Sequence, residues 1–193
     1  MNDPALGRAL LRLGYRAIEL GLDRANAPPP RACLRTTEDE TPAALGRPGA
    51  CFVTLRKSGK LRGCIGNLES EEPLLENVVT NAYRAAFHDP RFPPLAREEL
   101  NGLELHVSVI GPMEPVTFRD EAELITKLRP GIDGLVIRAG SCQATFLPAV
   151  WKQLPEADAF LRELKQKAEL PPRPLTSERL QAWRYVVRSF PGD

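Results

Sequence analysis

The stretch ACFVTLRKSGKLRGCIG, residues 50–66, decides the fold of the first half of this 193-residue chain. Two β-like runs flank Ser58 and Gly59, a pair typical of a two-residue hairpin turn. Such a turn would set Leu55 opposite Arg62 and Val53 opposite Cys64. Because side chains alternate along a strand, one face of this hairpin is predicted to carry Cys51, Val53, Leu55, Arg62, Cys64 and Gly66.

The composition places the chain among globular proteins without an overall electrostatic preference. Hydrophobic residues make up 42% of it, enough to bury a core as one domain or as one compact unit of two small lobes. Lys and Arg total 26 against 25 Asp and Glu, a net charge of +1. We therefore expect no general attraction to nucleic acid or to a membrane.

No apolar run approaches the roughly 18 residues of a membrane span, and charged residues interrupt the N-terminal stretch, so we expect a cytoplasmic protein.

The cysteine and histidine content indicates a reduced protein without a metal centre. The chain has four scattered cysteines and two histidines, with no CxxC or HxxxH pair. We predict free thiols, no metal site and no cofactor. The cysteines are Cys33, Cys51, Cys64 and Cys142.

Helical and strand patterns alternate irregularly along the rest of the chain. Residues 1–25 form a predicted amphipathic helix, residues 26–50 a Pro-rich extended connection, and residues 51–193 the main body of a single domain. Helices are predicted at 70–87, 120–128 and 155–170, a strand at 103–110, and a last β-like run at 183–190. Residues 130–148 are predicted to form a turn and a second hairpin that bends at Gly140 and Ser141. This order favours an α+β fold with a mixed, mainly antiparallel sheet and flanking helices.

Five segments between about residues 51 and 155 are distinctive: FVTLRKSGKLRGCIGNL, NAYRAAFHDPRFPPLAREEL, VSVIGP, PGIDGLVI and ATFLPAVWKQLP. Together they resemble the AMMECR domain family. The resemblance implies a mixed α/β domain whose prokaryotic members are often encoded beside a Memo-like protein and a radical SAM protein. Within that three-part system, the chain is similar to the A component. The resemblance supplies no established reaction.

Cys64 is the main candidate for chemistry. Flanking glycines let a ligand approach the backbone closely, and a nearby guanidinium, that of Arg62, would favour the nucleophilic thiolate. Gly63 and Gly66 would then form an anion cradle. The alternative is a small apolar cysteine packed against Val53 in a crowded hairpin.

Other polar residues form a second tier of candidates. On the predicted strand at 103–110, His106 with Glu104 could present a base to Cys64, although a solvated strand face explains the same pattern. In the HDPRF segment, Asp89 and Arg91 are candidate ligand contacts, or an acid that caps a turn and pairs with the arginine. The full set of candidate binding residues is Gly63, Gly66, Asn67, Asp89 and Arg91.

These observations leave two classes of function open, and whether the protein is an enzyme stays undecided. In the first, Cys64 acts as a thiolate nucleophile or covalent carrier, working with Memo-like and radical SAM partners. In the second, LRGCIG is a docking surface of a non-catalytic binding or scaffolding module. A weaker third possibility is RNA contact through the basic hairpin turn at residues 56–62, which lacks the aromatic residues that single-strand recognition usually uses.

Overall fold

The computed structural model describes residues 3–24, 26–34 and 42–192, which fold as two compact units. Unit 1 comprises Met1–Ile110 and Arg188–Asp193, and unit 2 comprises Gly111–Val187. Each unit has its own hydrophobic core. The α+β class predicted from the sequence is confirmed, with two four-stranded sheets built from antiparallel pairs.

Unit 1 opens with the amphipathic helix α1, Pro4–Gly21, as the sequence predicts. Asp3 caps it, because its carboxylate accepts hydrogen bonds from the backbone N–H groups of Ala5 and Leu6. Pro4 occupies the first turn, where the missing N–H has no helical partner to lose. The buried stripe of α1 contributes to the core of unit 1 through Leu6, Leu10, Leu13, Ala17 and Ile18.

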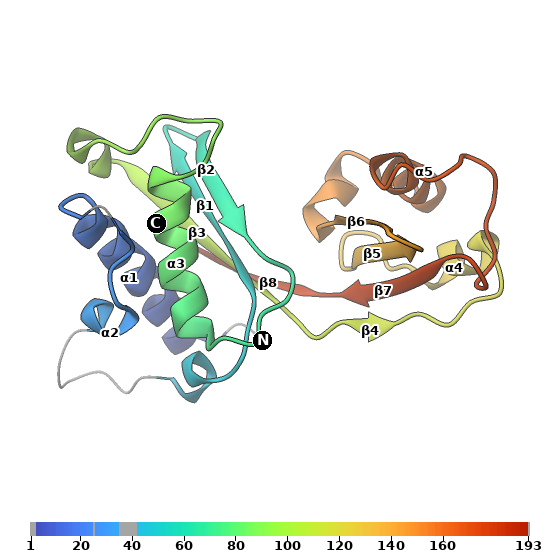
Figure 1. Cartoon of the computed structure of the whole chain (residues 1–193), viewed down its shortest axis with the longest axis horizontal. Coiled ribbons are helices and arrows are strands. Elements are labelled where there is room, and N and C mark those ends of the chain that lie inside the picture. The colour runs from blue at the N-terminus through green and yellow to red at the C-terminus, as the bar shows by residue number, and fades with distance from the viewer. Residues whose placement is uncertain (1–2, 25, 35–41, 193) are drawn as a thin grey trace. The chain divides into compact units, whose positions relative to one another are not determined.

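The sheet of unit 1 carries α1 and α3 on the same face (Figure 1). Its strand order is β2-β1-β3-β8, with β1 at Cys51–Lys57, β2 at Lys60–Gly66, β3 at Leu103–Ile110 and β8 at Val187–Pro191. Helix α3, Leu74–Phe87, packs on β1 and β2. Odd-numbered residues of β1 and β3 therefore point into the core, and even-numbered residues point to the opposite face.

The Pro-rich connection is not extended throughout, which corrects the prediction. Residues Pro30–Cys33 form a short helix, α2, with Pro30 in its first turn. A proline is compatible with that position because its fixed φ is already helical. A 3₁₀ turn, η1, follows at Ala43–Gly46. The part of the predicted connection at 35–41 lies outside the described residues.

Unit 2 combines a second sheet, ordered β4-β7-β5-β6, with helices α4 and α5. The hairpin of β5, Gly134–Ala139, and β6, Cys142–Phe146, is confirmed, and Leu135, Ile137 and Ala144 face the core. Helices α4, Glu121–Lys127, and α5, Ala157–Lys167, also match their predicted segments. The remaining elements are β4, Glu114–Pro115, β7, Gln181–Tyr185, and the 3₁₀ turns η2, Arg97–Leu100, in unit 1 and η3, Pro148–Lys152, in unit 2.

The last β-like run is two strands in two sheets, not one. β7 pairs with β4 and β5 in unit 2, whereas β8 lies beside β3 in unit 1. Val186 separates them, and its backbone carbonyl accepts a hydrogen bond from Gly111 N–H. The apolar pattern of this run is continuous because each half lies in a sheet. No helix among the described residues is both long and apolar enough to cross a membrane.

Candidate functional site

A bulge in the first hairpin sets which residues share a face with Cys64. The turn itself is as predicted, since Ser58 and Gly59 both have positive φ, 50° and 73°, and Lys57 lies opposite Lys60. The register then shifts between Leu55 and Arg56, so Thr54 rather than Val53 lies opposite Cys64. Leu55 lies opposite Gly63, not Arg62. The predicted face assignment is therefore wrong for the β2 residues beyond the bulge.

Cys64 consequently lies on the face of the sheet that α1 and α3 do not cover. Its Sγ is 3.1 Å from Oγ1 of Thr54, and either atom could be the donor. Thr54 also lies opposite His106 on the next strand, so a thiol, a hydroxyl and an imidazole form a row across three strands. All three side chains are half-buried. Two strand spacings, about 10 Å, separate the backbones of Cys64 and His106.

The imidazole of His106 has an unusual environment. Its Nε2 is buried and has no hydrogen-bond partner among the described residues. Oε2 of Glu104 lies 3.9 Å from this nitrogen, too far for a hydrogen bond. Thr54 therefore stands between the predicted base and the thiol, and His106 does not contact Cys64 directly.

The loop after α3 holds the peptide of Cys64 from both sides. Asp89 accepts the Cys64 backbone N–H with 2.8 Å between N and Oδ2. Arg91 donates to the Cys64 carbonyl oxygen from a terminal nitrogen 3.2 Å away. The same guanidinium binds Asp89 at 2.6 and 2.9 Å, so the three groups form a closed network. The thiol is thus carried on a backbone with little freedom to move.

Asp89 is the centre of this network. Its side chain is 2% exposed and is fully satisfied by Arg91 and the Cys64 N–H. Hydrogen bonds from Arg91, followed by those from the two backbone N–H groups, hold the pKa of Asp89 well below its usual range. The acid is therefore ionised and acts as a structural anchor for Cys64.

Arg62, the predicted electrostatic support of Cys64, is engaged elsewhere. Its guanidinium binds both carboxylate oxygens of Glu99, at 2.7 and 2.9 Å, and the carbonyl of Pro93 at 2.9 Å. This pairing lowers the pKa of Glu99 to about 2. Arg91, not Arg62, is the guanidinium bonded to the Cys64 peptide. Phe92 lies beneath both, with its ring centroid 5.9 Å from Arg62 and 5.5 Å from Arg91.

The two flanking glycines have packing reasons of their own. A Cβ on Gly63 would lie 2.1 Å from the backbone oxygen of Ala85 in α3, and one on Gly66 would lie 2.4 Å from the Phe52 ring. Asn67 accepts a hydrogen bond from Asn81 Nδ2 at 3.0 Å. Asn81 is buried and also donates to the Cys51 carbonyl, which ties the end of β2 to α3.

The other cysteines are separated from Cys64. Cys51 points into the core on the opposite face, contrary to the predicted shared face, and burial raises its pKa to about 12. Cys33 is also buried, while Cys142 lies half-buried in unit 2. All four thiols are free. In the part of the chain that the structure describes, no three His, Cys, Asp or Glu side chains are grouped to hold a metal ion.

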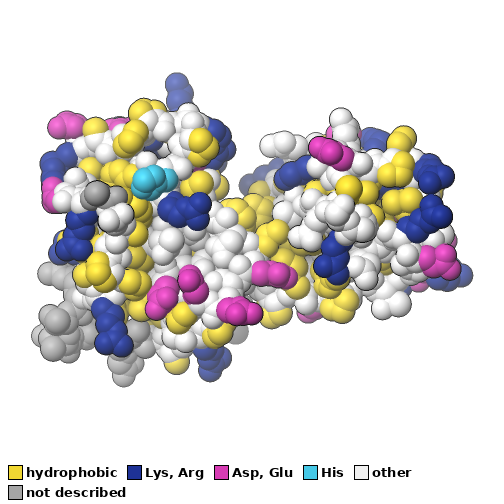
Figure 2. Space-filling view, viewed as in Figure 1, with side chains coloured by type: hydrophobic (Ala, Val, Ile, Leu, Met, Phe, Trp, Pro, Cys, Tyr) yellow, Lys and Arg dark blue, Asp and Glu magenta, His cyan; other side chains and the backbone are white. Residues whose placement is uncertain are grey.

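Two cations of the basic hairpin turn donate hydrogen bonds to backbone carbonyls of unit 1. Arg56 donates to the carbonyl of Gly59 at 2.9 Å, and Lys57 donates to that of Glu99 at 3.1 Å. On the face drawn in Figure 2, described Lys and Arg side chains are interspersed with acidic ones. The hydrogen bonds of Arg56 and Lys57 thus give these two cations a structural role that does not require RNA.

Sequence reasoning missed two residues of the site. Thr54 was missed because the alternation of apolar and polar residues in the two strands does not reveal the bulge that places it opposite Cys64. Glu99 lies 37 positions from Arg62, and neither of the two adjacent acids in REEL gives a signal for such a distant pair.

Comparisons with known sequences identify the family of this chain. The AMMECR1 family model matches residues 12–190. A protein of Methanothermobacter thermautotrophicus is 35% identical over 188 residues, covering 97% of this chain and 94% of that protein. A protein of Aeropyrum pernix is 41% identical over 152 residues, which cover 77% of this chain and 62% of that protein.

A solved structure extends this agreement to three dimensions. The crystal structure of an uncharacterised protein from Pyrococcus horikoshii superposes with a TM-score of 0.81 at 30% identity. The match covers 100% of this chain and 94% of that one. Sequence and fold therefore lead to the same conclusion: the chain belongs to the AMMECR1 family.

Proposed function

We propose that unit 1 carries a thiol-dependent active site, with Cys64 as nucleophile or covalent carrier. One observation carries the proposal: the half-buried Cys64 thiol lies 3.1 Å from the Thr54 hydroxyl while Asp89 and Arg91 fix its peptide. The Cys64 thiol lies outside the hydrophobic core of unit 1, where a purely structural cysteine would usually be buried. A positioned nucleophile benefits from both features.

The roles of the neighbouring residues follow from their contacts. The Thr54 hydroxyl contacts the Cys64 sulfur directly and can exchange a hydrogen bond with it. Arg91 and Asp89 position the nucleophile through its peptide and do not contact the sulfur. His106 and Glu104 lie further along the same face, where they can reach a substrate bound beside Thr54. Arg62, Gly63, Gly66 and Asn67 support the hairpin.

The proposal includes partners. Members of the family are often encoded beside Memo-like and radical SAM proteins, and we infer that this chain works with both. The face that carries Cys64 is the surface at which a partner would deliver or receive a substrate group.

Replacing single cysteines tests the proposal. Cys64→Ser should abolish the activity of the assembled three-protein system and leave affinity for the two partners unchanged. Cys142→Ser removes another half-buried free thiol and serves as the matched control, expected to match the wild type in both assays. Full activity of Cys64→Ser would leave a non-catalytic binding module as the function of this unit.

A second variant tests the thiolate itself. Thr54→Val keeps the shape of the side chain and removes the hydroxyl that contacts Cys64. The rate of Cys64 alkylation by iodoacetamide at pH 8, measured by mass spectrometry, should change in Thr54→Val, whereas Thr54→Ser should keep the wild-type rate. Identical rates for Thr54→Val and the wild type would remove Thr54 from the site.

A further inference from the structure

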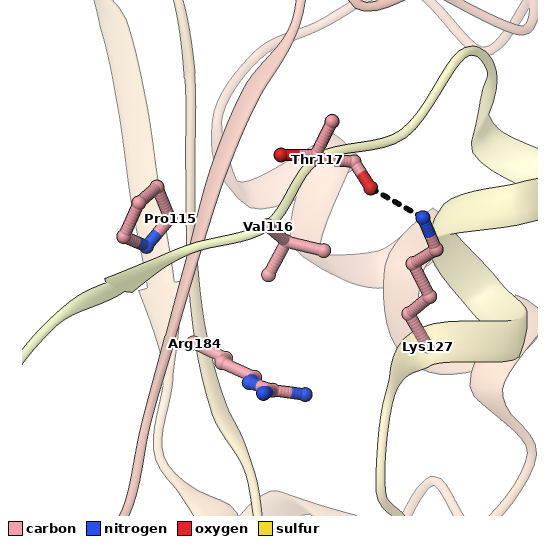
Figure 3. Close-up of a pocket in the computed structure, with 5 residues that line it drawn as sticks. All are labelled: Pro115, Val116, Thr117, Lys127 and Arg184. Carbon is pink, nitrogen blue, oxygen red and sulfur yellow. Dashed lines mark hydrogen bonds between the residues drawn. The ribbon is translucent and has the colours of Figure 1, made fainter.

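Unit 2 contains an open pocket that is independent of the Cys64 site. It has a volume of about 400 Å³ and is lined by Pro115, Val116, Thr117, Lys127 and Arg184 (Figure 3). The lining residues come from β4 and the segment after it, from the end of α4, and from β7. A pocket of this size accommodates a small molecule.

Two cations and no carboxylate line the pocket. The Nζ of Lys127 donates to the Thr117 carbonyl at 2.6 Å, which places the ammonium at the pocket wall. Arg184 extends from β7 toward the same space (Figure 3). The carboxylates that pair with these cations, Glu123 at 2.8 Å and Glu114 at 3.2 Å, are outside the lining.

Arg184 has donors to spare. Its Nε binds Glu114, and no described residue accepts a hydrogen bond from its two terminal nitrogens. A guanidinium offers five N–H donors in a planar fork, so the outer edge of Arg184 can bind an oxyanion while the pair with Glu114 persists. Lys127 likewise retains one of its three N–H donors after binding Thr117 and Glu123.

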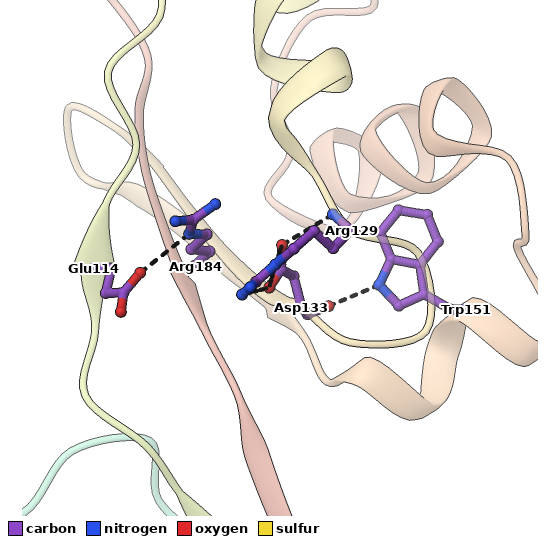
Figure 4. A network of polar contacts seen from close by, with 5 residues as sticks. All are labelled: Glu114, Arg129, Asp133, Trp151 and Arg184. Atoms are coloured by element: carbon purple, nitrogen blue, oxygen red, sulfur yellow. Dashed lines mark hydrogen bonds and ion pairs between the residues drawn. The ribbon is translucent and has the colours of Figure 1, made fainter.

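A buried network holds the chain beside the pocket in place (Figure 4). Asp133, which is 0% exposed, accepts hydrogen bonds from Arg129 at 2.6 and 3.0 Å. Its backbone carbonyl accepts one from Trp151 Nε1 at 2.7 Å, and the Trp151 ring stacks on Phe160 at 3.8 Å. Asp133 therefore satisfies Arg129 within the scaffold, whereas Lys127 and Arg184 face the pocket.

From this arrangement we propose that the pocket of unit 2 binds a small molecule bearing a phosphate monoester. A phosphate monoester carries close to two negative charges at pH 7 and presents several oxygens that can accept from the remaining donors of both cations. Pro115 and Val116 provide an apolar surface for the body of the ligand. The nearby carboxylates keep the empty pocket close to neutral, so binding depends on hydrogen-bond geometry as well as on charge. The site lies in unit 2, and its existence does not depend on Cys64.

Titration of the full-length protein with phenyl phosphate tests the proposal. Backbone amide shifts at Val116, Thr117 and Arg184, followed by NMR at constant ionic strength, should saturate with a single affinity. Lys127→Gln and Arg184→Gln should each weaken binding about tenfold or more, the cost of one charge-assisted hydrogen bond. Lys152→Gln removes one positive charge at an exposed position of unit 2 outside the lining and should bind like the wild type.

Three further results decide the assignment. Glu114→Gln removes a negative charge beside the site and should tighten binding, which keeps the test informative if Arg184→Gln fails to fold. Benzoate, a monoanion with the same ring, should bind about tenfold more weakly than phenyl phosphate. Equal or tighter benzoate binding would overturn the phosphate assignment, and so would an equal loss of affinity in Lys152→Gln. Shifts that fail to saturate or spread beyond the pocket would refute the site.

Discussion

The carboxylate of Asp89 accepts the backbone N–H of Cys64, with 2.8 Å between Oδ2 and the nitrogen. This bond joins the loop after α3 to the middle of β2, 25 residues earlier in the chain. β2 is an edge strand of its sheet, so the N–H of Cys64 finds its partner in a side chain instead of a further strand. The edge is thereby closed at the residue that carries the candidate nucleophile.

Asp89→Asn should destabilise the protein by about 2 to 4 kcal/mol. The substitution replaces a buried anion that holds Arg91 and the Cys64 N–H with an amide that cannot accept all of these donors. Urea unfolding at pH 7 measures the change. Asp23→Asn breaks an exposed ion pair with Arg97 and should cost about 0.5 kcal/mol or less. A loss at Asp89 no larger than that at Asp23 would show that the network contributes little.

Gly63→Ala should destabilise the protein by about 2 kcal/mol or more, because its Cβ would lie 2.1 Å from the Ala85 oxygen and α3 would have to move. The matched control is Gly46→Ala, since a Cβ there meets nothing within 4 Å. Thermal unfolding of the two variants should separate them by several degrees. Equal melting temperatures would contradict the close approach of β2 and α3.

Thiol labelling of the native protein should distinguish two classes of cysteine. Burial raises the pKa of Cys51 to about 12 and also raises that of Cys33, which keeps both as unreactive thiols. Iodoacetamide at pH 8 should therefore modify Cys64 and Cys142 within the time that leaves Cys33 and Cys51 unlabelled. Peptide mass spectrometry identifies the modified positions, and labelling in urea should reach all four. Rapid native labelling of Cys51 would contradict the packing of β1 on α3.

The sequence predicts much of this fold because its signals are local. The stripe of α1, the alternation in Leu103–Ile110 and the Ser58-Gly59 turn each arise within a few residues and survive in the structure. The division of residues 183–190 between two sheets could not be predicted in the same way. Apolar alternation records that a strand is buried and carries no information on which sheet buries it.

The site was only partly predictable for the same physical reason. Cys64, Asp89 and Arg91 were expected as candidates, and the structure brings them together. The partners of Cys64 and Arg62 depend on long-range geometry. The bulge places Thr54 instead of Val53 opposite Cys64, and Glu99 in η2 binds Arg62. A shift of one residue in register moves every later side chain to the other face, so one bulge was enough to alter the predicted environment of the thiol.

Acid should weaken the protein through Glu99 as well as Asp89. The hydrogen bond from Arg62 lowers the pKa of Glu99 from an ordinary value of 4.5 to about 2. A depressed carboxyl pKa stabilises the folded state above the unfolded pKa, and this contribution is lost as the pH falls from about 4.5 toward 2. Urea unfolding at pH 7, 4.5 and 3 should therefore show Glu99→Gln less stable than the wild type at pH 7, with the difference shrinking at pH 3. Glu98→Gln, at the exposed neighbouring position, should follow the wild type throughout. A pH-independent difference for Glu99→Gln would mean that the side chain acts through its shape and not through its charge.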